Sequence, residues 1–317
     1  MTTTTSVTID DVRAAAERVA GHALRTPTLP AVWAGGDLWL KAENLQPMGA
    51  FKIRGATNAI SRIDPETRHT GVVAHSSGNH AQAIAWAARE FGIPAAIAMP
   101  DVAPTVKVEA TRALGADVIL IPGAERESAA AEIRDERGMT LISPFDHPDV
   151  IAGQGTLALE FLEDLADVDT VLVPVGGGGL ISGVGVTVKA LSPSTRVVGV
   201  EPELAADVRE GLSAGHRVEW SAELTYRTIA DGVRTPLVGE ITFPLIQATV
   251  NEVVTVSEAA ILAAVGTTAR RAHLVAEPSG VLGIAAYLAD PARFGRTVAV
   301  VSGGNVDPAI LARAVTS

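Results

Sequence analysis

The chain has 317 residues, of which 47% are hydrophobic and 19% charged, and its formal net charge is −11. This acidic charge, without runs of Lys or Arg, argues against a nucleic-acid partner, and the absence of cysteine excludes disulfides, thiolate catalysis and Cys-ligated zinc. Because the sequence has no signal-peptide pattern and no apolar stretch of about 18 residues, we expect a cytoplasmic protein without a membrane partner.

Short apolar runs alternate along the chain with Ala-rich segments of helical spacing. The runs, which we expect to be strands, lie at 38–40, 71–75, 94–99, 117–121, 170–175, 196–201 and 297–302. Segments such as AQAIAWAAREFG and ILAAVGTTARRA are expected to be helices between them. The alternation predicts an α/β fold with a largely parallel sheet, in one large unit or two packed lobes.

Three of the expected strands run directly into a small polar turn and then into a helix. The turns are SSGNH after 71–75, GGGGL after 170–175 and GGNV after 297–302. At the carboxyl ends of parallel strands, free backbone N–H groups and helix dipoles gather around anions. The three turns therefore predict an anion-binding site.

The segment KAENLQPMGAFKIRGATNAI (41–60) places Lys52 in the first turn of a helix that starts near Phe51. The positive potential of a helix start and partial burial would lower the pKa of this amine and make it a better nucleophile. The alternative is a solvated lysine at a helix end. Arg54 and Asn58, on the same helix, are open to either a packing or a functional role. The chain has only four lysines as candidates for amine chemistry, namely Lys41, Lys52, Lys107 and Lys189.

The segment HSSGNHAQ (75–82) gathers hydroxyl, amide and imidazole groups around one glycine. The backbone N–H groups of Gly78, Asn79 and His80, together with the hydroxyls of Ser76 or Ser77, suit a substrate carboxylate at a helix start. A turn that merely caps the helix is the alternative.

The segment PVGGGGLISG (174–183) has four consecutive glycines and fits neither the dinucleotide fingerprint nor the Walker loop. We expect it to bind phosphate through backbone amides, with a close crossing of two backbones as the alternative.

The segment VVSGGNVD (300–307) places Ser302 at the end of an expected strand. Its hydroxyl could form a hydrogen bond with a heterocyclic nitrogen. Helix capping is the other interpretation.

In this order, the four motifs resemble the fold-type-II (tryptophan synthase β-like) pyridoxal-phosphate enzymes, specifically the serine/threonine dehydratase and serine racemase branch. The likeness extends to RTPTLP (25–30), VIAGQGTLALE (150–160), VEPE (200–203), TIADGV (228–233) and AEPSG (276–280). It implies a two-domain α/β fold of mostly parallel, twisted sheets flanked by helices, and a homodimer. The larger, cofactor-binding domain would comprise 1–70 plus 146–317, and the smaller, substrate-loop domain 71–145.

Roles follow from the resemblance by matching position. Lys52 would form the Schiff base with pyridoxal phosphate and act as a catalytic residue. The other cofactor contacts would be Phe51 beside the ring, Asn79 at the 3-hydroxyl, Ser302 at the ring nitrogen, Gly232 at the ring edge, and the amides of Gly176, Gly177, Gly178, Gly179 and Leu180 at the phosphate. The substrate would be bound by Ser76, Ser77, Gly78, Asn79 and His80, with Thr235 as a further contact.

The resemblance also implies a divalent cation, Mg²⁺, Mn²⁺ or Ca²⁺, bound by Glu201, the carbonyl of Ala205 and Asp207. Two carboxylates and a carbonyl suit a hard cation. The alternative is a pair of acids on a solvated loop. One departure from the family pattern is Ala50, which stands where a serine is usual before the Phe-Lys pair.

We expect β-elimination of a small 3-hydroxy amino acid of the threonine/serine type to a 2-oxo acid and ammonia. Lys52 would remove the Cα proton, and a neutral Ser302 at the ring nitrogen would favour loss of the β-hydroxyl. Ser77, as a second catalytic residue on the opposite face, would instead give a racemase of serine or another hydroxy amino acid. A 3-hydroxyaspartate dehydratase and a non-catalytic, ligand-binding α/β protein are further alternatives.

Overall fold

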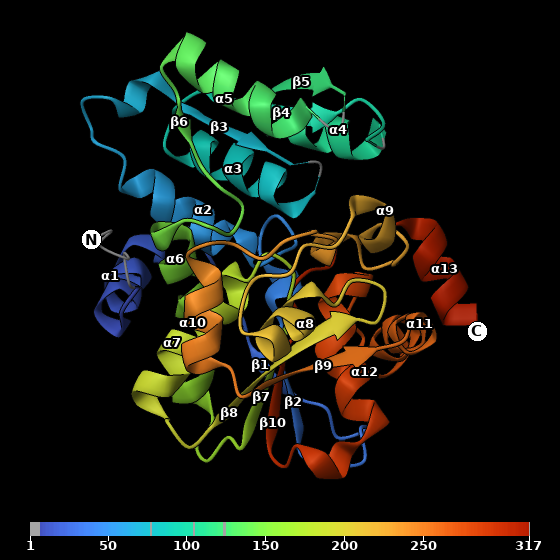
Figure 1. The fold of residues 1–317 in the computed structure, drawn as a ribbon. Coiled ribbons are helices and arrows are strands. Elements are labelled where there is room, and N and C mark those ends of the chain that lie inside the picture. The colour runs from blue at the N-terminus through green and yellow to red at the C-terminus, as the bar shows by residue number, and fades with distance from the viewer. Residues whose placement is uncertain (1–6, 77, 104, 123–124, 317) are drawn as a thin grey trace.

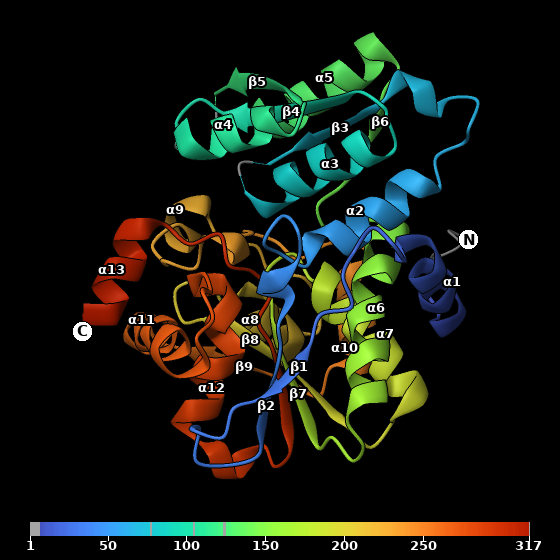
Figure 2. The same cartoon turned by 180° about the vertical axis from the view of Figure 1, so that it is seen from behind.

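The computed structural model describes residues 7–76, 78–103, 105–122 and 125–316. A smaller lobe lies above a larger body in Figure 1, and Figure 2 shows the same division from behind. Each lobe is built on its own sheet.

The sheet of the larger lobe has six strands, and only its first strand is antiparallel to its neighbour. In spatial order the strands are β1 (Thr28–Pro30), β2 (Leu38–Lys41), β10 (Thr297–Val300), β7 (Thr170–Pro174), β8 (Arg196–Pro202) and β9 (Glu252–Val256). All residues of β7 and β10 are buried, as expected for parallel strands covered on both faces.

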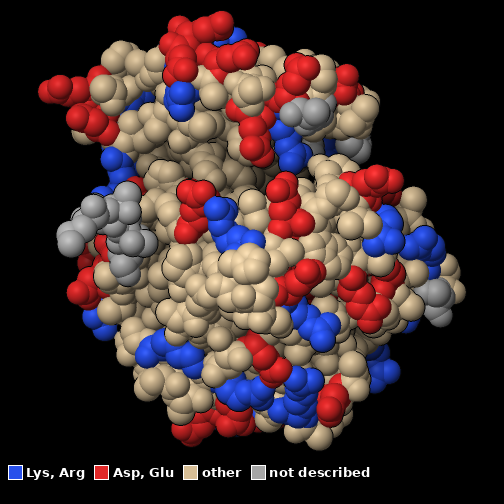
Figure 3. Space-filling view, viewed as in Figure 1, with Lys and Arg blue, Asp and Glu red and all other residues tan. Residues whose placement is uncertain are grey.

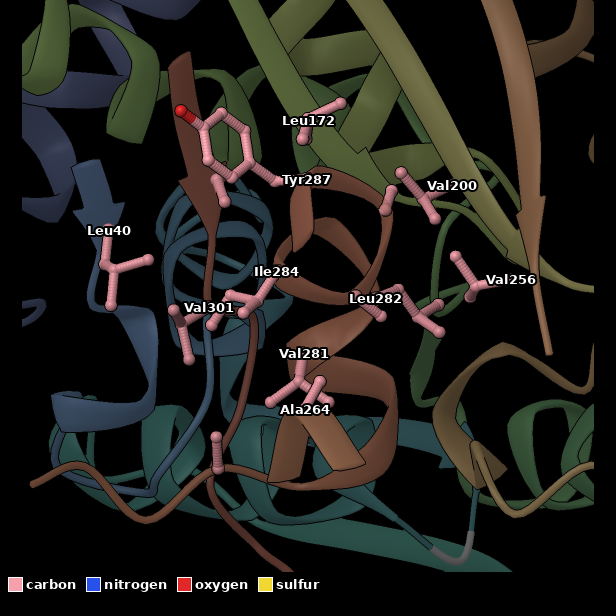
Figure 4. Close-up of a cluster of buried hydrophobic side chains, with 14 of the residues drawn as sticks. Leu40, Leu172, Val200, Val256, Ala264, Val281, Leu282, Ile284, Tyr287 and Val301 are labelled. Atoms are coloured by element: carbon pink, nitrogen blue, oxygen red, sulfur yellow. The ribbon is translucent and has the colours of Figure 1, made fainter. Parts of the chain in front are cut away.

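Helices cover both faces of this sheet (Figures 1 and 2). One face carries α1 (Ile9–Val19), α6 (Pro148–Asp164), α7 (Gly179–Leu191) and α10 (Thr242–Thr249), and the other carries α11 (Glu258–Thr267), α12 (Leu282–Ala289) and α13 (Pro308–Thr316). Figure 4 shows Leu282, Ile284 and Tyr287 of α12 beside Leu172 of β7 and Val200 of β8. Two further helices, α8 (Asp207–Ala214) and α9 (Ala222–Thr225), lie between β8 and β9 in the sequence.

The smaller lobe is a four-stranded parallel sheet with helices on it. The strand order is β5 (Asp117–Ile121), β4 (Ala95–Pro100), β3 (Val72–His75) and β6 (Thr140–Leu141), and the helices are α3 (Asn79–Glu90), α4 (Thr105–Ala113) and α5 (Arg126–Arg137). Helix α2 (Lys52–Ser61) contacts both α3 and α6. Its Ile53 and Ile60 share a hydrophobic core with Ile84 and Ile97 of the smaller lobe.

The chain also contains short helical turns. They are η1 (Glu43–Leu45), η2 (Arg68–Thr70), η4 (Asp231–Val233), η5 (Thr268–Ala272), η6 (Pro278–Val281) and η7 (Pro291–Arg293). Within the described residues, no helix has the length and apolarity that a membrane span requires.

The α/β prediction is confirmed, and each predicted strand is found with ends shifted by two residues at most. Three strands were missed, namely β1, β6 and β9. β1 and β6 have three and two residues, which is too short for an apolar run to stand out. β9 lies at the sheet edge, and three of its five residues are only partly buried.

Candidate active site

Lys52 is the first residue of α2, and no side chain caps this helix start. Its Nζ donates a hydrogen bond to the carbonyl oxygen of Pro144 at 2.5 Å and lies 5.1 Å from the centre of the Phe51 ring. Burial lowers the pKa of Lys52 to about 8. The amine is therefore far closer to its neutral, nucleophilic form at neutral pH than an ordinary lysine is.

The glycine loop joins β7 to α7, with Gly178 in the left-handed region at φ +92°. The carbonyl of Gly177 accepts hydrogen bonds from Thr242 Oγ1 at 2.8 Å and from the Gly239 amide at 3.3 Å. A Cβ on Gly177 would lie 2.2 Å from the Phe145 ring, so close packing requires glycine here. No side chain caps the start of α7, whose first amides thus remain as donors for an oxyanion. The close-packing interpretation of this loop therefore applies, and phosphate binding by the same loop stays a prediction.

Residues 144–146 connect the amine to the glycine loop. The Pro144 carbonyl accepts from Lys52, whereas the neighbouring Phe145 lies against Gly177 and Gly179. The carboxylate of Asp146 accepts from three backbone amides, those of Glu240, Ile241 and Thr242. Lys52 and the glycine loop thus contact two adjacent residues of a segment that is itself held by hydrogen bonds.

Ser302 follows β10, and its side chain is buried. Among the described residues its hydroxyl has one long contact, 3.5 Å, with the carbonyl of Ser279, so a stronger partner could still bind it. The Ser279 hydroxyl accepts from the Gly232 amide at 2.8 Å. Thr235 is close to the glycine loop, since a Cβ on Gly176 would lie 3.4 Å from its hydroxyl. Ser279 was given no role from the sequence, although it is part of the AEPSG segment.

The predicted substrate loop leads from β3 into α3, which begins at Asn79 with Gly78 as N-cap and no side-chain cap. The Ser76 hydroxyl accepts from the Gly78 amide at 3.1 Å, and Ser77 lies outside the described residues. His80 Nε2 lies 3.0 Å from the Ile142 carbonyl. Burial, assisted by the charge of Lys52, lowers the pKa of His80 to about 3, so its ring stays neutral. An anion here would be bound by backbone amides and not by an imidazolium.

The side chain of Asn79 reaches the larger lobe, where it contacts two residues that the sequence reasoning missed. Its Nδ2 donates to Glu277 Oε1 at 2.7 Å, and its Oδ1 accepts from Asn305 Nδ2 at 2.8 Å. Both partners belong to segments already noted, AEPSG and SGGNVD, which were the available signal.

The three predicted cation ligands are buried at the end of β8 and the start of α8. Glu201 accepts hydrogen bonds from the amides of Val208 and Arg209. The two carboxylate oxygens of Asp207 have no partner at normal hydrogen-bond geometry among the described residues, although the amides of Asp207 and Val238 lie near enough to oppose the rise in its pKa. Burial raises the pKa of Asp207 to about 7, and burial together with Asp207 raises that of Glu201. No cluster of three or more His, Asp or Glu side chains in the described part of the chain could hold a metal, so protein carbonyls would have to complete a site here.

Arg54 and Asn58 have structural roles. The Arg54 guanidinium is buried and pairs with Glu43 at 2.8 Å and with Glu160 at 2.7 Å, and Lys41 also pairs with Glu160. Asn58 accepts from Arg18 and donates to the carbonyl of Asp149. The packing alternative is therefore correct for both residues.

The site residues fit pyridoxal phosphate. A half-buried amine, an uncapped helix start after a glycine loop, and a buried hydroxyl with no strong partner among the described residues match the aldehyde, phosphate and ring nitrogen of this cofactor. Figure 3 shows a hollow between the smaller lobe and the larger body, with acidic and basic side chains interspersed over this face.

Comparison with known proteins gives a consistent result. The family model "Pyridoxal-phosphate dependent enzyme" matches residues 19–303. The chain is 46% identical to an L-threo-3-hydroxyaspartate ammonia-lyase of a Pseudomonas species, over 94% of this chain and 95% of that protein. It is 43% identical to an L-threonine ammonia-lyase of Thermotoga maritima, over 98% and 78% of the two chains. The structure of maize serine racemase superposes with a TM-score of 0.91 at 38% identity, covering 98% of this chain and 97% of that chain.

These relatives confirm the fold class and the branch that the motifs indicated, and they favour an enzyme over a non-catalytic binding protein. The relatives include ammonia-lyases and a racemase, as the alternatives from the sequence do. The chain belongs to the family of pyridoxal-phosphate-dependent enzymes, in its serine/threonine dehydratase and serine racemase branch.

Proposed function

We propose that the chain is an ammonia-lyase that converts a small 3-hydroxy amino acid to a 2-oxo acid and ammonia. The observation that carries the proposal is the convergence at residues 144 and 145. There the half-buried amine of Lys52 and the glycine loop contact adjacent residues, which suits one cofactor that spans both. The names of the ammonia-lyase relatives support this reaction class.

In the proposed reaction each group of the chain has a separate task. The amides of Gly176 to Leu180 hold the phosphate, and the amides at 78–80 orient the substrate carboxylate. When bound, pyridoxal phosphate withdraws electrons from Cα and makes its proton acidic. Lys52 removes that proton and holds it on Nζ, a task that its lowered pKa of about 8 favours. Ser302 would offer the ring nitrogen a neutral hydroxyl and no carboxylate to keep it protonated, so the electron pair from Cα would be held less well by the cofactor. This favours departure of the β-hydroxyl, which would leave as water with the proton held on Lys52 Nζ.

A panel of L-threonine, L-serine, L-threo-3-hydroxyaspartate and their D-isomers would test the proposal through release of 2-oxo acid. We expect at least one L-isomer to give equal amounts of 2-oxo acid and ammonia. If no member of the panel releases 2-oxo acid while the purified protein carries cofactor, the lyase assignment fails.

A racemase is the second candidate, favoured by the 38% identity to maize serine racemase. It needs a proton donor opposite Lys52, the role proposed for Ser77. Chiral analysis of recovered substrate separates the two reactions, because inversion faster than 2-oxo acid formation would identify a racemase.

We also propose that a divalent cation binds at Glu201, the Ala205 carbonyl and Asp207, supported by the buried oxygens of Asp207, which no described residue pairs at normal hydrogen-bond geometry. Because the pKa of Asp207 is raised, the folded protein keeps a proton on this carboxyl at pH values where the unfolded chain has lost it. The cation-free protein therefore loses stability as pH rises from about 4 to about 7. A cation would replace that proton. We expect Mg²⁺ or Ca²⁺ to raise the melting temperature more at pH 8 than at pH 6, by several degrees.

The variant Asp207→Asn should lose this cation effect and should be more stable than the unsubstituted protein in chelator at pH 8. Glu203→Gln, which changes an exposed acid in the same segment, is the matched control and should keep the effect. An unchanged cation response in Asp207→Asn would place the cation elsewhere.

We propose a homodimer, supported by apolar side chains around the turn η1. Leu45 is 43% exposed, and Leu24 and Val275 are each 51% exposed. Gln46 binds both backbone groups of Leu24, and Asn44 donates to the Val275 carbonyl, so the three apolar side chains flank one turn. Such a surface suits a second copy of the chain.

Sedimentation or light scattering of Leu45→Glu should show a monomer where the unsubstituted chain is a dimer. Val102→Glu, which changes an 85% exposed side chain of the smaller lobe, should leave the mass unchanged. A dimer that persists in Leu45→Glu would exclude this surface as the interface.

The domain division at 1–70 plus 146–317 and 71–145 is likewise a proposal, supported by the location of all four strands of the smaller sheet between 72 and 141. The cytoplasmic location expected from the sequence stays a prediction, which cell fractionation would test.

A further inference from the structure

Glu277 is a buried acid at the site for which the proposed reaction has no use. It immediately precedes η6, is only 4% exposed, and accepts from Asn79 Nδ2 at 2.7 Å. The Gly303 backbone lies against it, since a Cβ there would be 2.2 Å from Glu277 Oε1. The glycine of the SGGN segment therefore leaves room for the carboxyl group to reach Asn79.

The orientation of the Asn79 amide follows from a chain of hydrogen bonds that starts at a backbone carbonyl. Asn305 Nδ2 donates to the Met48 carbonyl, which can only accept, and so the same nitrogen faces Asn79. Asn79 must then present its oxygen to Asn305 and its nitrogen to Glu277. One Nδ2 hydrogen is bound by Glu277, and the second remains available.

We propose that Glu277 is a positioning residue, which holds the Asn79 amide so that its second N–H is presented to the ring oxygen of the cofactor. This inference rests on the proposed function, because the contact between Asn79 and the 3-hydroxyl is part of it. The hydrogen bond also joins the lobes, since Asn79 begins α3 and Glu277 belongs to the larger lobe. The backbone of Asn79 is therefore fixed by the smaller lobe, whereas its side-chain amide is bound by the larger lobe.

Two charged residues near Glu277, Asp231 and Lys107, form an ion pair between the lobes and also change the pKa of Glu277. Burial and the neighbouring Asp231 raise the pKa of Glu277 to about 7, whereas Lys107 and the hydrogen bonds from Asn79 and the Asn305 amide oppose that rise. Lys107 of α4 pairs with Asp231 of η4 at 2.7 Å across the two lobes. The positive charge of Lys107, held there by the ion pair with Asp231, favours the ionised form of Glu277. An ionised Glu277 is the better hydrogen-bond acceptor for Asn79.

The experiment uses the purified holoenzyme and measures the cofactor absorption spectrum across about pH 5 to 9, together with the dissociation constant of pyridoxal phosphate. In Glu277→Gln, which keeps the shape, we expect the spectral change centred near pH 7 to disappear. In Glu277→Ala, which removes the acceptor, we expect cofactor affinity to fall by about 10-fold and the spectrum to shift at all pH values. Unchanged spectra and affinity in both variants would overturn the inference.

Two further variants test whether Glu277 positions Asn79 or only stabilises the fold. Asp231→Asn removes a negative neighbour and should move the midpoint of the spectral change to lower pH, while Lys107→Met should move it to higher pH. Lys189→Met, a lysine on α7 bound to the Thr195 carbonyl, is the control and should not move it. Shifts of the same sign in Asp231→Asn and Lys107→Met would contradict the inference.

Failure of this inference is distinguishable from failure of the proposed function. If the unsubstituted protein binds no pyridoxal phosphate, the proposed function fails. If it binds the cofactor normally and the Glu277 variants do so with the same spectra, only the role of Glu277 is wrong.

Discussion

Lys52→Ala is expected to lose at least about 10³-fold in kcat/KM and to lose all cofactor that borohydride fixes to the protein. The reason is that Nζ donates to the Pro144 carbonyl, and the next residue, Phe145, packs against the glycine loop. Peptide mapping of the reduced, unsubstituted protein should place the label on Lys52. Label on Lys41, Lys107 or Lys189 would contradict the assignment.

The pH dependence of cofactor attachment to Lys52 gives a second test of the same assignment. An amine attacks an aldehyde only in its neutral form, and a pKa of about 8 makes half of Lys52 neutral at pH 8. An ordinary lysine is roughly 0.3% neutral there. Capture of pyridoxal phosphate by the apoenzyme should therefore rise with pH, with its midpoint near pH 8, and level off about one pH unit higher. Lys189→Ala, whose lysine binds the Thr195 carbonyl, is the control and should behave as the unsubstituted chain does.

Arg54→Met is expected to lower the free energy of unfolding by about 3–5 kcal/mol, the largest stability effect that we predict. The variant would leave the fully buried Glu43 without its cation and Glu160 with Lys41 alone. Thermal unfolding should show a melting temperature lower by on the order of 10 °C. Cofactor binding should weaken as well, because Arg54 and Lys52 lie in the same turn of α2.

Arg25→Met is the matched control for this prediction. Arg25 also pairs with two carboxylates, those of Glu163 and Asp164, but its side chain is 51% exposed. Exposed pairs contribute about 0–1 kcal/mol, so the melting temperature should change by a few degrees at most. Equal decreases in melting temperature in the two variants would mean that burial of the ion pairs between Arg54 and the carboxylates of Glu43 and Glu160 does not add to stability.

Local patterns predicted the strands and the turns that follow them. The runs at 170–175 and 297–302 became β7 and β10, which are neighbours in one sheet, so their glycine turns emerge at the same edge. The first motif was also predicted well, because a helix start is a local property, and α2 begins at Lys52. These features depend on residues close together in the sequence.

Features that join distant segments could not be predicted in this way. A helical arginine such as Arg54 looks like a surface residue until Glu43 and Glu160 are brought to it by the fold. The role of Glu277 depends on the position of Asn79 in the other lobe, 198 residues away in the sequence. The edge strand β9 was missed because its partly exposed residues do not form the continuous apolar run that marks the central strands.

The chain passes between the lobes twice, and the two connections are unequal. Residues 144–146 contact the amine, the glycine loop and the amides before α10. In the other connection, residues 64–67 are exposed, and the hydrogen bonds found for them within the described chain are to one another and to near neighbours. A cut in the backbone between Pro65 and Glu66 would therefore leave the contacts of the proposed site intact, whereas a cut at 144–146 would divide them.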